Sequence, residues 1–193
     1  MPEFKISRNV RELVRLGSKN GVVVVPYKSD RMEFEKAKTL VKEVCCSTGS
    51  ELLKKDGPQK LKDLELARSH LENSRAGGFS TLVEVYQLKA MNLLLQALVF
   101  EETDKPKEMI LKLKEISETY NTIGNLHALD AKDLAKRDTL EQLAHLKRKE
   151  AKEAFENAKI VEYEISRLDR ELARYSPVAL GVELGHGPIR PAV

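Results

Sequence analysis

The stretch AKEAFENAKIVEYEISRLDRELARY, residues 151–175, decides the fold. It contains no Pro or Gly, and its apolar residues recur at alternating spacings of three and four. Such spacing averages 3.5 residues, which is the repeat of a coiled-coil contact stripe. The stripe predicts a long helix that another helix must cover, and we expect self-association there. The predicted oligomerisation residues are Ala154, Ala158, Val161, Ile165, Leu168, Leu172 and Tyr175.

A second ladder with the same spacing lies earlier in the chain. Its members are Met109, Leu113, Ile116, Tyr120, Ile123 and His127. A polar segment separates the two ladders, so we expect two helices joined by a turn. Gly124 and the Asn residues beside it favour a turn at 121–125, and the polar segment 130–138 is the alternative. A helix that runs from a turn at 121–125 to Tyr175 would be about 75 Å long and would need partner helices.

The most apolar part of the chain is Leu82–Phe100. Its apolar residues occupy most sides of a helix, which indicates burial on most sides. Polar residues such as Glu84 and Asn92 interrupt it too often for a membrane span. We therefore expect a soluble protein, without membrane contact, in which this segment is the central packing helix. Thr81, three residues before Glu84, fits the N-cap of a capping box.

Local signals predict the ends of the other helices. Asp30 with Glu33 forms a capping box at the start of one helix. The sequence Asp56–Gly57–Pro58 predicts a break, after which Pro58 is the first residue of the next helix. The apolar stripe of that helix ends at Gly77–Gly78.

The two ends of the chain differ from its helical middle. Residues 1–28 are predicted to form a small basic α/β element, in which Val22–Val25 is a short strand. Residues 177–193 are rich in Gly and Pro and predict an extended tail. A second strand at 178–184 is expected there, and whether the two strands pair is left open. Residues 29–176 are predicted to form the helical bundle and oligomerisation domain. The predicted fold class is therefore mainly α, an elongated antiparallel helical bundle with two long coiled-coil-like helices.

Composition limits the function classes. Charged residues make up 33% of the 193-residue chain and aromatic residues 5%, which suits elongated helices with solvated faces. The net charge of +3 is small, so any affinity for nucleic acid needs a local basic patch. Cys45 and Cys46 are adjacent and poorly placed to bridge each other, which indicates reduced thiols in the cytoplasm.

Motifs for catalysis or cofactor binding are not found. A di-iron bundle needs two Glu-x-x-His motifs on facing helices, which the chain does not carry. No glycine-rich phosphate loop or nucleophile elbow occurs either. Glu141 and His145, four residues apart, are expected to form an exposed pair. His127 is expected to fix the packing register of its ladder, with pH sensing as the alternative. We predict no enzymatic activity, cofactor, metal or small-molecule substrate.

The N-terminal segment carries a basic face. Arg8, Arg11 and Arg15 lie at i, i+3 and i+7 of one helix face, and with Lys19 they could contact phosphates. A solvated face opposite Val10 is the favoured interpretation. The favoured function is a non-enzymatic assembly or scaffold protein that self-associates as a homo-oligomer. The alternative is an oligomeric nucleic-acid-binding adaptor, of a packaging or chromosome-associated type, that uses the basic face.

Overall fold

The structure is a computed structural model, and it describes residues 4–19, 31–46, 50–74 and 79–175. Within these residues the protein is mainly helical, with six α-helices, one short 3-10 helix and no strand. The elements are α1 (Arg8–Lys19), α2 (Arg31–Cys46), α3 (Ser50–Asn73), α4 (Phe79–Glu102), α5 (Pro106–Leu134), η1 (Asp138–Leu140) and α6 (Glu141–Arg174). The predicted strands at Val22–Val25 and 178–184 and the tail at 177–193 lie outside the described residues.

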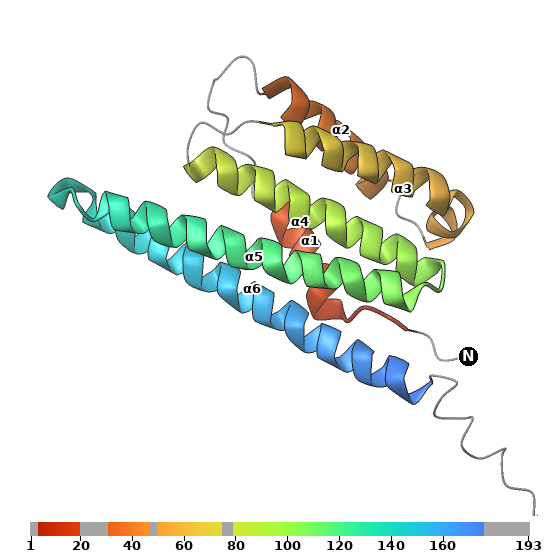
Figure 1. The fold of residues 1–193 in the computed structure, drawn as a ribbon. Helices are drawn as coiled ribbons and strands as arrows, with labels where there is room; N and C mark the ends of the chain where they lie inside the picture. The colour runs from red at the N-terminus through yellow and green to blue at the C-terminus, as the bar shows by residue number, and fades with distance from the viewer. Residues whose placement is uncertain (1–3, 20–30, 47–49, 75–78, 176–193) are drawn as a thin grey trace, which may run out of the picture.

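Helix α4 runs through the middle of the molecule, with α2 and α3 on one side and α5 and α6 on the other (Figure 1). Residues 92–97 of α4 are all buried. Leu93 and Leu94 pack in one core with α5, α6 and the N-terminal segment, and Leu95 packs in a second core with α2 and α3. The predicted central helix is therefore confirmed. By length and composition Leu82–Glu102 would also suffice to cross a membrane, and half of that segment is buried in the molecule.

Two polar side chains in the middle of α4 are buried and bonded to each other. The Asn92 side-chain amide donates to the Leu64 carbonyl of α3 at 2.8 Å, and the Gln96 amide donates to Asn92 Oδ1 at 2.7 Å. A buried amide without a partner would cost free energy, so this chain of bonds fixes the position of α3 along α4.

Two predicted helix boundaries are wrong. Helix α3 continues through Pro58, although proline removes one helical hydrogen bond. Gly57, just before it, has no Cβ, so α3 comes close to the end of α4. A Cβ at Gly57 would lie 3.2 Å from Thr103 Cγ2. Helix α4 begins at Phe79, so Thr81 lies inside the helix and not at its N-cap.

The two predicted ladders belong to α5 and α6, which lie side by side (Figure 1). The favoured turn at 121–125 is wrong, because α5 continues through it and the connection lies at residues 135–140, near the alternative position. Gly124 serves close packing here: a Cβ built on it would lie 2.6 Å from Phe155 Cε1. With 34 residues, α6 is about 51 Å long and not 75 Å.

The N-terminal segment packs on this bundle. Ile6, Val10 and Leu13 are buried in the same core as α4, α5 and α6. Each such side chain stabilises the fold by about 2 kcal/mol through the apolar area that it removes from water. The described part of residues 1–28 therefore shares its core with the helices that follow.

Candidate functional site

The predicted oligomerisation ladder is covered within the chain. Ala154, Ala158, Val161, Ile165 and Leu168 are all buried in the single chain. Val161, Ile165 and Leu168 share a core with α4, α5 and the N-terminal segment. Leu172 is partly buried against the same core. Tyr175 is exposed, and its ring meets the Phe4 ring edge-on at a centroid distance of 6.2 Å. The ladder thus forms contacts inside one protomer, and its buried residues offer no surface to a second copy.

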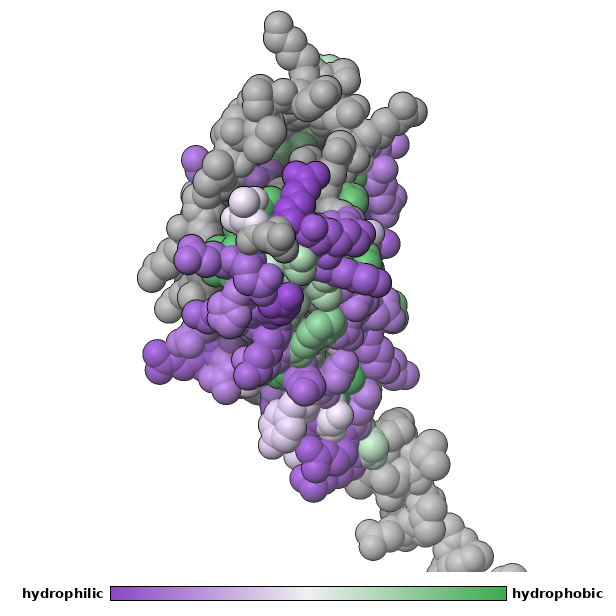
Figure 2. Space-filling view, turned by 90° about the vertical axis from the view of Figure 1, so that its left-hand side faces the viewer, coloured by the Kyte–Doolittle hydropathy of each residue, from purple (hydrophilic) through white to green (hydrophobic). Residues whose placement is uncertain are grey.

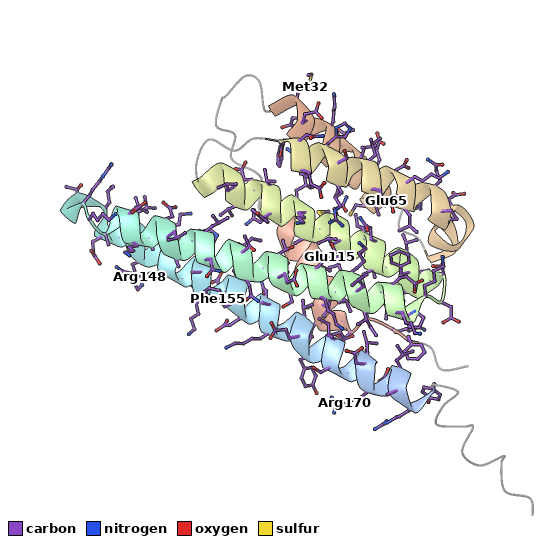
Figure 3. The ribbon with its side chains drawn as sticks, in the orientation of Figure 1. Met32, Glu65, Glu115, Arg148, Phe155 and Arg170 are labelled. Atoms are coloured by element: carbon purple, nitrogen blue, oxygen red, sulfur yellow. The ribbon has the colours of Figure 1, made fainter. Side chains whose placement is uncertain are left out.

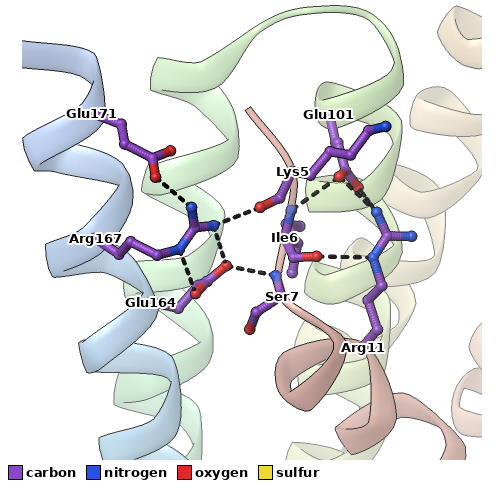
Figure 4. Close-up of polar contacts among 8 residues, drawn as sticks. All are labelled: Lys5, Ile6, Ser7, Arg11, Glu101, Glu164, Arg167 and Glu171. Carbon is purple, nitrogen blue, oxygen red and sulfur yellow. Dashed lines mark hydrogen bonds and ion pairs between the residues drawn. The ribbon is translucent and has the colours of Figure 1, made fainter. Parts of the chain in front are cut away.

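Beside this ladder, α6 holds the N-terminal segment through a buried carboxylate (Figure 4). Glu164 is 2% exposed and accepts a hydrogen bond from the Ser7 backbone N–H at 2.6 Å. Arg167 donates to Glu164 at 2.8 Å and to the Lys5 carbonyl at 2.6 Å. Burial alone would raise the pKa of Glu164, but the hydrogen bonds from Arg167 and Ser7 outweigh it and hold the pKa below its ordinary value.

The predicted basic face is divided by the fold. Arg11 donates to both carboxylate oxygens of Glu101 on α4, and its side chain is 41% exposed (Figure 4). The Glu101 side chain is only 4% exposed, and this burial raises its pKa although Arg11 acts in the opposite direction. Arg8 is exposed and pairs with Glu12 one turn later, at 2.8 Å. The side chains of Arg15 and Lys19 lie outside the described part of the structure. The Arg11 guanidinium is therefore paired with Glu101 and helps to hold the N-terminal segment on α4, while part of its side chain stays exposed.

The outermost part of the α5–α6 pair extends past α4. Near its start, α4 places Val83 in a cluster with Ile123 and Ala154. Beyond this point lies the free end of the hairpin, which we define as residues 128–151. It carries three exposed leucines, Leu129, Leu143 and Leu146, at 50%, 41% and 47% exposure. Figure 2 looks at this end of the molecule and shows hydrophobic side chains in a line between hydrophilic ones.

A groove of about 650 Å³, the hairpin groove, lies between α5 and α6, partly at the free end and partly beside it along α6. Its lining residues are Ala128, Ala131, Lys132, Ala135, Arg148, Ala151, Lys152, Phe155, Glu156 and Lys159. The small alanine side chains leave the groove open between the two helices. Phe155, which packs on Gly124, supplies its largest apolar side chain. Arg148 and Phe155 both project from α6 on this part of the molecule (Figure 3).

The rim of the hairpin groove is basic. Four cationic side chains line it, against the single carboxylate of Glu156. Arg148 pairs with Glu141 at 3.3 Å and Lys152 with Glu156 at 3.9 Å, and both cations are more than half exposed. Exposed pairs of this kind contribute little stability and exchange easily with other partners. Lys132 and Lys159 form no ion pair with a described residue, so the rim carries an excess of positive charge.

The two sides of α6 differ at the free end. Leu146 and Phe155 are nine residues apart, which is two and a half turns, so they point in opposite directions. Leu143 is eleven residues before Ala154, about three turns, so it lies on the side of α6 that faces α4 further along. The hairpin groove and the exposed Leu143 and Leu146 are therefore separate surfaces.

His127 lies between α5 and α6 beside the free end. Its side chain is 9% exposed, and its Nδ1 is 3.1 Å from Glu150 Oε2. The two groups are not aligned, so Nδ1 has no hydrogen-bond partner among the described residues. Burial lowers the pKa of His127, and Lys147 acts in the same direction, whereas Glu150 and Asp130 raise it. The imidazole is therefore mainly neutral near pH 7.

Sequence reasoning missed the hairpin groove, although its signal was present. Ala128 and Ala131 of α5 and Ala135, just after its end, recur at spacings of three and four, and Ala144 and Ala151 of α6 are seven residues apart. Small residues at this spacing indicate close helix packing, and the adjacent Lys and Arg residues show that one side stays open to solvent.

The comparisons give no relative. No protein-family model, curated protein or solved structure matches the chain. Among the described residues, no group of three or more His, Cys, Asp or Glu side chains is placed to hold a metal ion.

Proposed function

We propose that the protein is a non-enzymatic helical assembly or scaffold protein, and that it self-associates through Leu143 and Leu146 at the free end of the hairpin. The observation that supports this proposal is the length of α5 and α6, which extend past α4. Leu143 continues the side of α6 that α4 covers further along. Apolar residues that continue along a helix beyond the part covered by its neighbour favour contact with a further helix.

A second copy of the chain is the occupant that we propose. Two-fold pairing brings the same surface of each subunit together, so Leu143 and Leu146 of one protomer would meet those of its partner. The finer architecture belongs to the same proposal: an elongated antiparallel bundle in which α5 and α6 pack as a coiled coil. The order of their contacts supports it, because Ser117 bonds Glu162 whereas His127, further along α5, approaches Glu150, earlier on α6.

Solution mass tests the self-association. We expect light scattering to give at least twice the 21.8 kDa of one chain for the unmodified protein. The variant Leu143→Glu/Leu146→Glu should have the mass of one chain, because dimerisation would bury the introduced glutamates of the two copies against each other. The matched control is Leu66→Glu/Leu111→Glu, at two leucines that are 51% and 57% exposed elsewhere, and it should keep the larger mass. A single-chain mass for the unmodified protein up to about 100 µM would reject the proposal.

The nucleic-acid adaptor remains a second candidate function, supported by the exposed Arg8. Because Arg11 holds the N-terminal segment on α4, replacing it would confuse a loss of binding with a loss of folding. The sharper variant is Arg8→Ala/Arg15→Ala. A salt-dependent gel shift with duplex DNA that this variant abolishes would favour the adaptor over the scaffold.

A further inference from the structure

We propose that the hairpin groove is a docking site for an acidic amphipathic α-helix of a partner protein. This inference goes beyond self-association, and it uses the side of α6 opposite Leu146. It rests on three properties of the groove: its length, its apolar floor and the charge of its rim.

The length of the groove matches a short helix. Its lining extends over Arg148–Lys159 of α6, about 17 Å of helix, and from Ala128 of α5 to Ala135, just after the end of that helix. A helix laid along this surface would make contact over about three turns. A volume of about 650 Å³ accommodates several apolar side chains from one face of such a helix.

The floor of the groove favours a helix with an apolar face. Ala128, Ala131 and Ala151 have small side chains, which let a third helix approach the first two closely. Phe155 is half-buried and held on Gly124, so it presents a fixed aromatic contact at little cost in side-chain entropy. Binding of an amphipathic helix in an apolar groove is a common mode of peptide recognition.

The rim determines the charge of the partner. Lys132, Arg148, Lys152 and Lys159 surround the floor, and Glu156 is the single acidic residue among the lining side chains. Glu or Asp residues flanking the apolar face of a bound helix would pair with these cations and set its orientation. A nucleic acid would use the same cations but leave the apolar floor without a suitable partner, so the acidic helix fits better.

Labelled peptides test the proposal. The probe is a designed helix of about 16 residues with Leu at i, i+3, i+4 and i+7 and Glu on its other faces, and the comparison peptide has Lys in place of every Glu. We expect fluorescence anisotropy in about 0.15 M salt to give the acidic peptide a Kd at least about tenfold lower. Equal binding of the two peptides, or no binding of the acidic one up to about 100 µM, would overturn the proposal.

Variants locate the binding site. Lys132→Glu/Lys152→Glu should raise the Kd of the acidic peptide by about tenfold or more. The control Lys42→Glu/Lys62→Glu makes the same change in net charge on α2 and α3, and it should bind the peptide as the unmodified protein does. Ala128→Phe changes an exposed position, so it preserves the fold and fills the groove, and it should block binding. Normal binding by Ala128→Phe contradicts the proposal. So does tighter binding of a DNA duplex of about 20 base pairs that displaces the peptide.

The peptide result is separate from the mass result. Leu143→Glu/Leu146→Glu changes the other side of α6, so it should bind the acidic peptide as the unmodified protein does. Loss of self-association with retained peptide binding supports both proposals. If the unmodified protein has the mass of one chain and still binds the acidic peptide, the proposed self-association is rejected and the proposed docking site is not.

Discussion

Gly124 of α5 lies directly under the ring of Phe155 of α6, and a Cβ at Gly124 would come within 2.6 to 2.8 Å of three ring carbons. This contact sets how closely the two long helices pack. An alanine inside a helix normally stabilises it by about 1 kcal/mol relative to glycine. Overpacking of this severity costs about 1–3 kcal/mol. We therefore expect Gly124→Ala to lower the free energy of unfolding, measured by urea denaturation, by about 1 kcal/mol.

A double-mutant cycle isolates the contact between the ring and the backbone. Once Phe155→Ala has removed the ring, Gly124→Ala should change sign and stabilise the protein by about 0.5–1 kcal/mol. Gly57→Ala in α3 is the matched control, because its Cβ would meet Thr103 Cγ2 at 3.2 Å. Its effect should be smaller than that of Gly124→Ala. Additive effects of Gly124→Ala and Phe155→Ala would show that the ring does not set the spacing.

The sequence predicted the helical elements that depend on long apolar patterns. The central helix over Leu82–Phe100 and the ladder after Ala151 extend over many turns, and tertiary packing follows such patterns closely. The turn at 121–125 was predicted wrongly because it rested on Gly124 and its neighbours alone. In the structure this glycine leaves room for the ring of Phe155, thirty-one positions later in the chain. The residues next to Gly124 in the sequence give no sign of this contact.

The candidate site was less predictable than the fold. The spacing of Val161, Ile165 and Leu168 shows that a helix must cover them, but spacing does not say whether that helix belongs to the same chain. In the structure α4, α5 and the N-terminal segment of the same chain cover these residues. The hairpin groove depends on where α4 begins relative to α5 and α6, and this offset is a property of tertiary packing.

Glu164 holds the N-terminal segment on α6, and we expect Glu164→Gln to destabilise the protein by about 2 kcal/mol near pH 7. The folded state keeps the pKa of Glu164 below its ordinary value, so the stability that it contributes is present above about pH 4.5 and is lost as the pH falls through the folded pKa. The difference between the variant and the unmodified protein should therefore shrink in acid. Urea denaturation at several pH values measures it.

An exposed carboxylate provides the control for Glu164. Glu156→Gln removes an ion pair with Lys152 that is 3.9 Å long and solvent-exposed, so it should cost less than about 0.5 kcal/mol at any pH. Proteolysis gives an independent readout, because release of the N-terminal segment should expose residues 4–13 to cleavage in Glu164→Gln but not in Glu156→Gln. Equal stability and equal protection of the two variants would contradict the role of Glu164.

The buried amides of α4 lead to a third prediction. Asn92→Leu removes the acceptor of the Gln96 amide and leaves that donor buried without its partner, so we expect a loss of about 1–3 kcal/mol. Replacing both residues, as in Asn92→Leu/Gln96→Met, removes the unpaired donor and should recover most of that loss. The free energies of unfolding of the single and double variants check this. A double variant less stable than Asn92→Leu would show that packing, and not the hydrogen bonds, limits this part of the core.

His127 should make the protein less stable in mild acid. Burial keeps its folded pKa below the ordinary value of 6.5, so the unfolded chain takes up the proton first. Stability is therefore lost as the pH falls from about 6.5 toward the folded pKa. Glu150 and Asp130 favour the protonated ring and Lys147 opposes it, but burial is the larger effect.

The variant His127→Gln tests this because glutamine fills a similar volume and does not titrate. The other three His residues are present in both proteins, so subtracting the two pH profiles of unfolding free energy isolates His127. We expect the unmodified protein to lose more stability than His127→Gln between about pH 7 and pH 5. A larger loss in His127→Gln would mean that Glu150 outweighs burial and that the folded state binds the proton more tightly than the unfolded chain does.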